Sequence, residues 1–137
     1  MKVNNARIIN LEPIIDGIDG YLCVAENQRE IPFEIKRVYY IYNLDSPQAV
    51  RGKHAHRELE QVLFCLKGSF DLLLDDGFKQ EKILMENPQT GIYMGTGVWH
   101  IMDNFSKDCV IMVLASDYFT EKDYIRDYDE FTRFKNR

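Results

Sequence analysis

The chain has few of the features that mark a secreted, disulfide-bonded or membrane protein. It holds three cysteines in 137 residues, Cys23, Cys65 and Cys109, which lie far apart and form no C-x-x-C motif. This spacing argues against a disulfide framework and favours buried thiols in a reducing compartment. No apolar run reaches the length of a membrane span, and residues 1–10 lack the apolar stretch of a signal peptide. We therefore expect a cytoplasmic protein with no membrane contact.

Positive charge is also scarce. The 17 basic residues are outnumbered by 22 acidic ones, which gives a net charge of -5. Because a general nucleic-acid binder is usually basic, this balance argues against a nucleic-acid partner. An anionic small molecule is still compatible with the sequence, since Arg37, Arg51 and Lys53 lie near the segment that carries two of the histidines.

Histidine is rarer still, and the three that occur fall into one pattern. His54 and His56 are separated by one residue, and His100 ends the run Gly-Thr-Gly-Val-Trp-His. Two histidines one residue apart on a strand point to the same face, so both can reach one small site. A neutral imidazole exchanges a proton near neutral pH or binds a metal ion, so either chemistry is possible at such a site.

Short runs of β-branched and aromatic residues, separated by turn residues, make up most of the chain. Such runs predict many short strands, a pattern typical of a β-sandwich or barrel. They cover residues 7–11, 21–26, 33–43, 61–67, 69–74, 79–84, 91–94, 99–102 and 109–116. Only the C-terminal segment has helical spacing, in Tyr124, Tyr128 and Phe131. It predicts a helix within residues 120–134, with Thr120 as a candidate N-cap.

Both histidine motifs resemble motifs of the cupin superfamily. The first cupin motif, H-x-H followed by Glu and Gly, is matched by His54, His56 and Gly68. The second, G-x-x-H-x-x-x-N, is matched by Gly97, His100 and Asn104. The resemblance implies an all-β fold, a cupin jelly roll (double-stranded β-helix) with a short C-terminal helix. We expect residues 1–137 to form it as a single domain.

The carboxylate that completes a metal site in many cupins is out of register here. Its position holds Gln61, whereas Glu60 comes one residue earlier. A neutral amide is a poor ligand for a divalent cation, and strand alternation turns Glu60 to the opposite face from Gln61. We therefore expect no metal and no other cofactor, and we favour proton transfer by the histidines. The alternatives are a metal-dependent cupin enzyme that uses Glu60 and a non-catalytic cupin that binds a nucleotide sugar.

Longer segments narrow the resemblance further. They are residues 31–40 (IPFEIKRVYY), 51–56 (RGKHAH), 60–63 (EQVL), 98–100 (VWH), 114–119 (LASDYF) and 123–126 (DYIR). Over about residues 8–131 the chain is similar to the sugar 3,4-ketoisomerase family, which acts on dTDP-4-keto-6-deoxyglucose. The resemblance implies a cofactor-free isomerase that moves the sugar carbonyl from C4 to C3 through an enediol. The product, a dTDP-3-keto-6-deoxyhexose, would supply the synthesis of 3-amino-3,6-dideoxyhexoses for surface polysaccharides.

The same resemblance implies roles for individual residues. His54 is expected to remove the proton from C3, and His56 to relay protons between O3 and O4. Tyr39 would orient an oxygen or donate a proton, and Arg51 would hold the pyrophosphate by bidentate contacts. The remaining residues expected to bind substrate are Arg37, Gln61, Trp99 and His100.

Two further expectations follow from the resemblance. Family members differ in the face from which C4 is protonated, and His100 favours the galacto product over the gluco product. A homodimer is also implied. The apolar outer face of the 61–67 strand, with Val62, Phe64 and Leu66, is a candidate for the contact between subunits.

Overall fold

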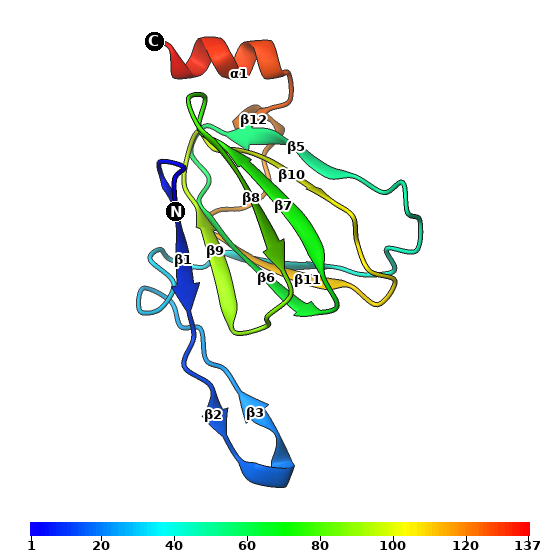
Figure 1. Cartoon of the computed structure of the whole chain (residues 1–137). Coiled ribbons are helices and arrows are strands. Elements are labelled where there is room, and N and C mark those ends of the chain that lie inside the picture. Colours follow the sequence, from blue (N-terminus) through cyan, green and yellow to red (C-terminus); the bar gives the residue numbers. More distant parts are fainter.

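Two five-stranded antiparallel sheets account for most of the protein, and the computed structural model describes all of residues 1–137 (Figure 1). One sheet has the strand order β1-β9-β6-β11-β4, and the other has the order β12-β5-β10-β7-β8. The strands are β1 (Ala6–Asn10), β4 (Arg37–Ile41), β5 (Arg51–His56), β6 (Gln61–Lys67), β7 (Phe70–Asp75), β8 (Gln80–Met85), β9 (Thr90–Met94), β10 (Trp99–Asp103), β11 (Val110–Ala115) and β12 (Tyr124–Ile125). The only α-helix, α1 (Tyr128–Lys135), comes last. The predicted all-β jelly roll with a short C-terminal helix is confirmed.

Side chains alternate between the inside of the sandwich and its outer faces, as the two-residue period of a strand requires. On β6, Leu63 and Cys65 point inward and join the larger core with Leu72 and Leu74 of β7. This alternation also decides which face of β6 Gln61 occupies, since Gln61, Leu63 and Cys65 are two residues apart.

The outer face of β6 is covered by the chain itself. Val62 and Phe64 are fully buried in a second cluster that includes Ile31 and Phe33. Of the three residues expected at a contact between subunits, only Leu66 is exposed. The expectation that Val62 and Phe64 meet a second subunit is therefore wrong, because an N-terminal segment of the same chain fills that place.

Two predicted strands are shorter in the structure than in the sequence analysis. The run at 33–43 forms a strand only over β4 (Arg37–Ile41), because Phe33 leaves the sheet to cover the outer face of β6. The run at 21–26 forms only β3 (Tyr21–Leu22), which pairs with β2 (Ile14–Ile15) across a short 3₁₀ turn at Gly17–Asp19.

The β2–β3 hairpin projects from the end of the sandwich opposite α1 (Figure 1). Its apolar side chains have no cover from the rest of the chain. Those that are exposed are Ile14, Ile15, Ile18, Tyr21 and Leu22. A hairpin of two-residue strands gains little stability from its own pairing, so these side chains form an unpartnered apolar surface.

The C-terminal helix begins later than the sequence predicts. Tyr124 and Ile125 add β12 to the edge of the second sheet by pairing with His56 and Ala55 of β5. Asp127 is the N-cap of α1, and its side chain accepts a hydrogen bond from the backbone N–H of Glu130. The expected start near Thr120 is wrong, because pairing with the open edge of β5 takes Tyr124 out of the helix. No helix of the structure is long and apolar enough to cross a membrane.

We expect Phe131→Ala to destabilise the fold strongly. Phe131 is the buried residue of α1, and its ring packs against Trp99 of β10 with ring centroids 5.5 Å apart. Truncating a buried phenylalanine costs about 3–5 kcal/mol of unfolding free energy, which urea denaturation would measure. Phe78→Ala is the control, because Phe78 is 68% exposed and should change the free energy by no more than about 0.5 kcal/mol. Equal losses in the two variants would contradict the packing of Phe131 against Trp99.

Candidate functional site

The three histidines meet on the inner face of the second sheet. His54 and His56 lie on β5, and His100 lies on β10 directly opposite His54. The ring centroid of His54 is 4.9 Å from that of His56 and 4.6 Å from that of His100. The centroids of His56 and His100 are 6.1 Å apart. The fold thus brings His100 to His54 and His56, which lie 44 or more positions earlier in the sequence.

A distortion of β5 sets the orientation of the His54 side chain. Gly52 and Lys53 both have positive φ angles, 86° and 59°, and the register between β5 and β10 shifts at this point. A Cβ atom on Gly52 would lie 2.7 Å from the carbonyl oxygen of His100, so only glycine fits there without displacing backbone. The same distortion places the Gly52 carbonyl 3.0 Å from Nδ1 of His54.

Each histidine uses its Nδ1 atom for a bond within the protein. The acceptors are the Gly52 carbonyl for His54 at 3.0 Å, the Asp123 carboxylate for His56 at 2.9 Å and the Val98 carbonyl for His100 at 3.5 Å. Carbonyl and carboxylate oxygens only accept hydrogen bonds, so Nδ1 carries the proton in each ring. In the neutral rings Nε2 is then left without a proton and can accept one.

Burial keeps the three rings neutral. It is the largest cause that lowers the pKa of His54 to about 4, and repulsion between two protonated rings, His54 and His56, lowers it further. Burial also lowers the pKa of His56, although the hydrogen bond and charge of Asp123 oppose that shift. The pKa of the fully buried His100 lies well below its ordinary value, again mainly because of desolvation. The cluster can therefore accept protons at neutral pH.

The first sheet contributes a phenol, an amide and a guanidinium. The Tyr39 hydroxyl donates a hydrogen bond to Oε1 of Gln61 at 3.0 Å. Burial is the main cause that raises the pKa of Tyr39 to about 12, so the phenol keeps its proton. Arg37, on the same face of β4, places its guanidinium carbon 5.3 Å from the centre of the Tyr39 ring. Its buried Nε atom has no hydrogen-bond partner and is available to a ligand.

Of the other predicted site residues, one joins this group and one does not. Arg51 is exposed at the start of β5, and its charge acts on the phenol of Tyr39. Trp99 precedes His100 on β10 and therefore points to the opposite face, where it packs against Phe131 beneath α1. The expectation that Trp99 lines the site is not met, because its side chain packs against α1 instead.

Two residues that the sequence analysis did not assign lie against the histidines. The ring of Tyr124 on β12 packs at a steep angle against both His54 and His56, with centroid distances of 4.7 and 4.5 Å. Asp123, just before it, holds Nδ1 of His56. Residues 123–126 carried part of the family resemblance. Because their spacing is helical, the sequence analysis did not predict that they form a strand that pairs with β5.

Glu60 lies away from the histidines, as strand alternation predicts. It accepts a hydrogen bond from the hydroxyl of Tyr93, whose ring belongs to the cluster on the outer face of β6. A metal-dependent site built on Glu60 would need this side chain on the inner face instead. No group of three or more His, Cys, Asp and Glu side chains is arranged to hold a metal ion.

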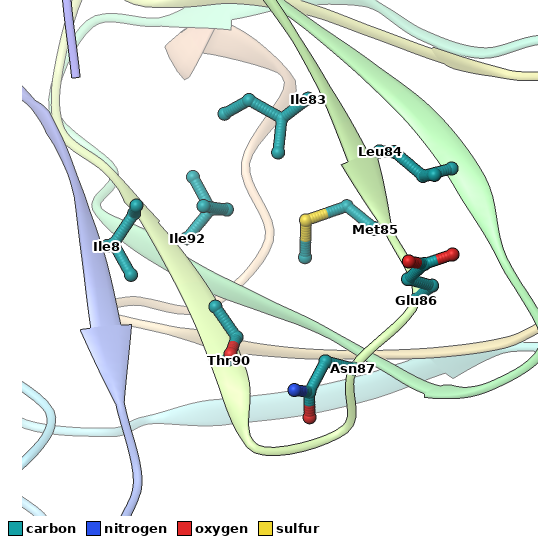
Figure 2. Close-up of a pocket in the computed structure, with 8 residues that line it drawn as sticks. All are labelled: Ile8, Ile83, Leu84, Met85, Glu86, Asn87, Thr90 and Ile92. Atoms are coloured by element: carbon teal, nitrogen blue, oxygen red, sulfur yellow. The ribbon is translucent and has the colours of Figure 1, made fainter.

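A second candidate site is an apolar hollow of about 240 Å³ that is lined by residues of β1, β8 and β9 and by none of the histidines (Figure 2). Ile8, Ile83, Met85 and Ile92 surround it, where β8 lies near β9 and β1. Glu86 is the only titratable residue in its lining. The hollow therefore lacks the proton carriers that the histidine cluster offers, and we place the chemistry at the histidines.

The chain matches a known protein family and a curated relative over most of its length. Residues 4–136 match the family model described as FdtA: WxcM-like, C-terminal. The chain is 50% identical over 128 residues to a protein of Aneurinibacillus thermoaerophilus named TDP-4-oxo-6-deoxy-alpha-D-glucose-3,4-oxoisomerase, covering 93% of this chain and 91% of that one.

Solved structures of similar proteins have the same fold. WlaRB of Campylobacter jejuni, a TDP-quinovose 3,4-ketoisomerase, is 48% identical and superposes with a TM-score of 0.91, over 96% of this chain and 99% of that one. A variant of the 3,4-ketoisomerase QdtA from Thermoanaerobacterium thermosaccharolyticum, in complex with TDP-4-keto-6-deoxyglucose, is 39% identical with a TM-score of 0.93. That match covers 98% of this chain and 96% of that one.

The low pKa of His54 leads to a prediction for stability. An NMR titration of His54 should have its midpoint near pH 4, whereas an unperturbed histidine titrates near about 6.5. Between these values the unfolded chain binds a proton at this residue and the folded chain does not. The free energy of unfolding should therefore fall as the pH is lowered from about 6.5 towards 4, less steeply in His54→Asn. A midpoint near 6.5 would contradict the burial of this ring.

Proposed function

Since the chain belongs to the FdtA (WxcM-like, C-terminal) family, we propose that it is a TDP-sugar 3,4-ketoisomerase that converts TDP-4-keto-6-deoxyglucose into the 3-keto isomer. The observation that carries the proposal is the cluster of three neutral imidazoles with proton-free Nε2 atoms. The substrate class is supported by the 50% identical relative and by the QdtA variant in complex with that sugar.

The reaction needs proton transfers and no net oxidation. A base removes the hydrogen on C3 as a proton, and the electron pair of that bond forms the C3–C4 double bond. The π electron pair of the C4 carbonyl moves to O4, which gives an enediolate. The proton on O3 is transferred to O4, and C4 then receives a proton as the carbonyl forms at C3. Groups that carry protons at neutral pH, together with a donor for the oxygen of the intermediate, are the residue types that such a sequence uses.

The two histidines of β5 divide this work. His54 removes the C3 proton through Nε2, since its Nδ1 atom is engaged with the Gly52 carbonyl. His56 passes protons between O3 and O4 through its Nε2 atom, which is buried and has no partner in the protein. The 4.9 Å between the two ring centroids suits neighbouring carbons and oxygens of one sugar ring.

Residues of both sheets bind and polarise the sugar nucleotide, since Arg51 lies on β5 and Tyr39, Arg37 and Gln61 lie on the first sheet. Tyr39, with a pKa raised to about 12, stays protonated, and its single O–H turns from Oε1 of Gln61 to a sugar oxygen when the substrate is bound. Before the sugar binds, Gln61 holds the phenol in place through its Oε1 atom. Arg51 and Arg37 supply positive charge for the pyrophosphate, a group for which the planar guanidinium is well suited.

The configuration at C4 of the product depends on the face that is protonated. His100 lies opposite His54 and favours the galacto product by resemblance. In the 3-keto product the coupling between the protons on C4 and C5 is small for the galacto form and large for the gluco form. The product spectrum therefore decides this prediction.

The active form is proposed to be a homodimer. The exposed apolar hairpin β2–β3, with Ile14, Ile15 and Leu22, supports this, because a second copy of the chain would remove these side chains from water. The hairpin replaces the outer face of β6 as the proposed contact. We also propose that the enzyme works in the cytoplasm, in keeping with its three free cysteines.

Incubation with TDP-4-keto-6-deoxyglucose tests the proposed activity directly. The wild-type protein should convert the sugar into its 3-keto isomer, followed by proton NMR. His54→Asn should lower turnover by about 10²- to 10⁴-fold, because it removes the base. Lys82→Asn is the control, since Lys82 is 64% exposed in its side chain and lies on β8, at the opposite edge of the sheet from β5 and β12. A sugar that binds and stays unchanged would make the protein a binding module instead.

Sedimentation of a hairpin variant tests the proposed dimer. The double substitution Ile15→Asp and Leu22→Asp places two carboxylates on the exposed apolar surface of β2 and β3. The wild-type protein should sediment as a dimer and the variant as a monomer, because burying an unpaired carboxylate is costly. Leu66→Asp, at an exposed position of β6, is the control and should stay dimeric. A variant that dimerises like the wild type would exclude the hairpin as the contact.

A further inference from the structure

We propose that Asp123 is a positioning residue, which fixes the His56 imidazole in the tautomer with the proton on Nδ1 and so keeps Nε2 free to accept a proton from the sugar. This inference rests on the proposed function, in which His56 relays protons between O3 and O4.

The geometry places Asp123 behind His56, on the side away from its free nitrogen. Oδ2 of Asp123 lies 2.9 Å from Nδ1 of His56, and the two side chains are 10% and 4% exposed. The opposite ring nitrogen, Nε2, is buried and unpartnered. Nδ1 of His56 is thus hydrogen-bonded within the protein, and Nε2 is available to a ligand.

The carboxylate is itself held in a fixed orientation. Its Oδ1 atom accepts a hydrogen bond from the backbone N–H of Glu58 at 2.6 Å. Its Oδ2 atom accepts one from the backbone N–H of Leu59 at 3.3 Å in addition to that from His56. Three N–H donors therefore converge on two oxygens, and no other acceptor of the structure serves Nδ1 of His56.

His56 differs in this respect from the other two histidines. Nδ1 of His54 and of His100 faces a neutral backbone carbonyl, whereas Nδ1 of His56 faces a charged group. A carboxylate stabilises a positively charged imidazole far better than a carbonyl does. In keeping with this, Asp123 raises the pKa of His56 against the lowering by burial. His56 is therefore the histidine best suited to carry a proton briefly between two oxygens.

A purely structural role for Asp123 has to be separated from this one. Asp123 also connects the segment before α1 to the β5–β6 turn, where its backbone carbonyl accepts a hydrogen bond from the N–H of Arg57. Loss of the carboxylate could loosen that connection without affecting the tautomer. A substitution that keeps the size of the side chain and changes only its hydrogen bonding distinguishes the two roles.

The substitution Asp123→Asn distinguishes the structural role of Asp123 from its role in fixing the His56 tautomer. Asparagine has a single acceptor oxygen, and the N–H groups of Glu58 and Leu59 compete for it. The amide NH₂ then faces Nδ1 of His56, which must become an acceptor, so the ring proton moves to Nε2. The ¹⁵N NMR spectrum of His56 should show Nδ1–H in the wild type and Nε2–H in the variant. The turnover number should fall by about 10²- to 10⁴-fold. KM should change much less, because Arg37 and Arg51 still bind the pyrophosphate of the nucleotide sugar.

Asp117→Asn is the matched control. Asp117 lies in the segment that leads to Asp123, and its side chain is 59% exposed. It forms an ion pair with Lys36 at 3.9 Å and accepts a hydrogen bond from the backbone N–H of Tyr118 at 2.8 Å, and it contacts no histidine. The substitution Asp117→Asn removes the same negative charge as Asp123→Asn. It should leave both the His56 tautomer and the turnover number as they are in the wild type.

The outcomes separate the two proposals. An Nδ1–H tautomer in Asp123→Asn, or wild-type turnover in that variant, overturns the positioning role. An Nε2–H tautomer of His56 in the wild-type protein overturns it as well, and this reading holds even if the variant fails to fold. If the wild type leaves TDP-4-keto-6-deoxyglucose unchanged, the proposed function fails, and the tautomer spectra alone decide the role of Asp123.

Discussion

The proposed chemistry depends on one constraint, the hydrogen bond that each histidine makes through Nδ1. A neutral imidazole has one proton, and a fixed acceptor at Nδ1 decides where it sits. The distortion at Gly52 provides that acceptor for His54, and the return of the chain to the edge of β5 brings Asp123 to His56. Burial then keeps the rings neutral. Local backbone geometry, strand pairing and solvation together leave Nε2 of each ring free to act as a base.

The two sheets carry different parts of the proposed reaction. The second sheet supplies proton acceptors on β5 and β10, and the first supplies a protonated phenol and a guanidinium on β4. The pyrophosphate is proposed to be bound by guanidinium groups of both sheets, Arg37 on β4 and Arg51 on β5. The net charge of -5 is compatible with an anionic substrate, because Arg37 and Arg51 lie on the strands that carry Tyr39 and His54.

Strand alternation made part of this site predictable from the sequence. It places His54 and His56 on one face, and it separates Gln61 from Glu60. The same rule separates Trp99 from His100, which the family resemblance alone did not do. Contacts between distant segments were not predictable: Asp123 reaches His56 across 67 residues, and the Ile31 segment covers Val62. The start of α1 was missed because the spacing of Tyr124 and Tyr128 fits a helix as well as a strand followed by a helix.

Solvent deuterium tests the central claim most directly, because it shows whether side chains carry the proton. The wild-type protein converts TDP-4-keto-6-deoxyglucose in D₂O, and the hydrogen on C4 of the product is identified by NMR. Removal of the C3 proton by imidazoles that exchange with solvent predicts deuterium at C4. Complete retention of the original C3 hydrogen at C4, together with undiminished turnover in His54→Asn, would indicate a transfer that bypasses the histidines and would contradict their proposed role in proton transfer.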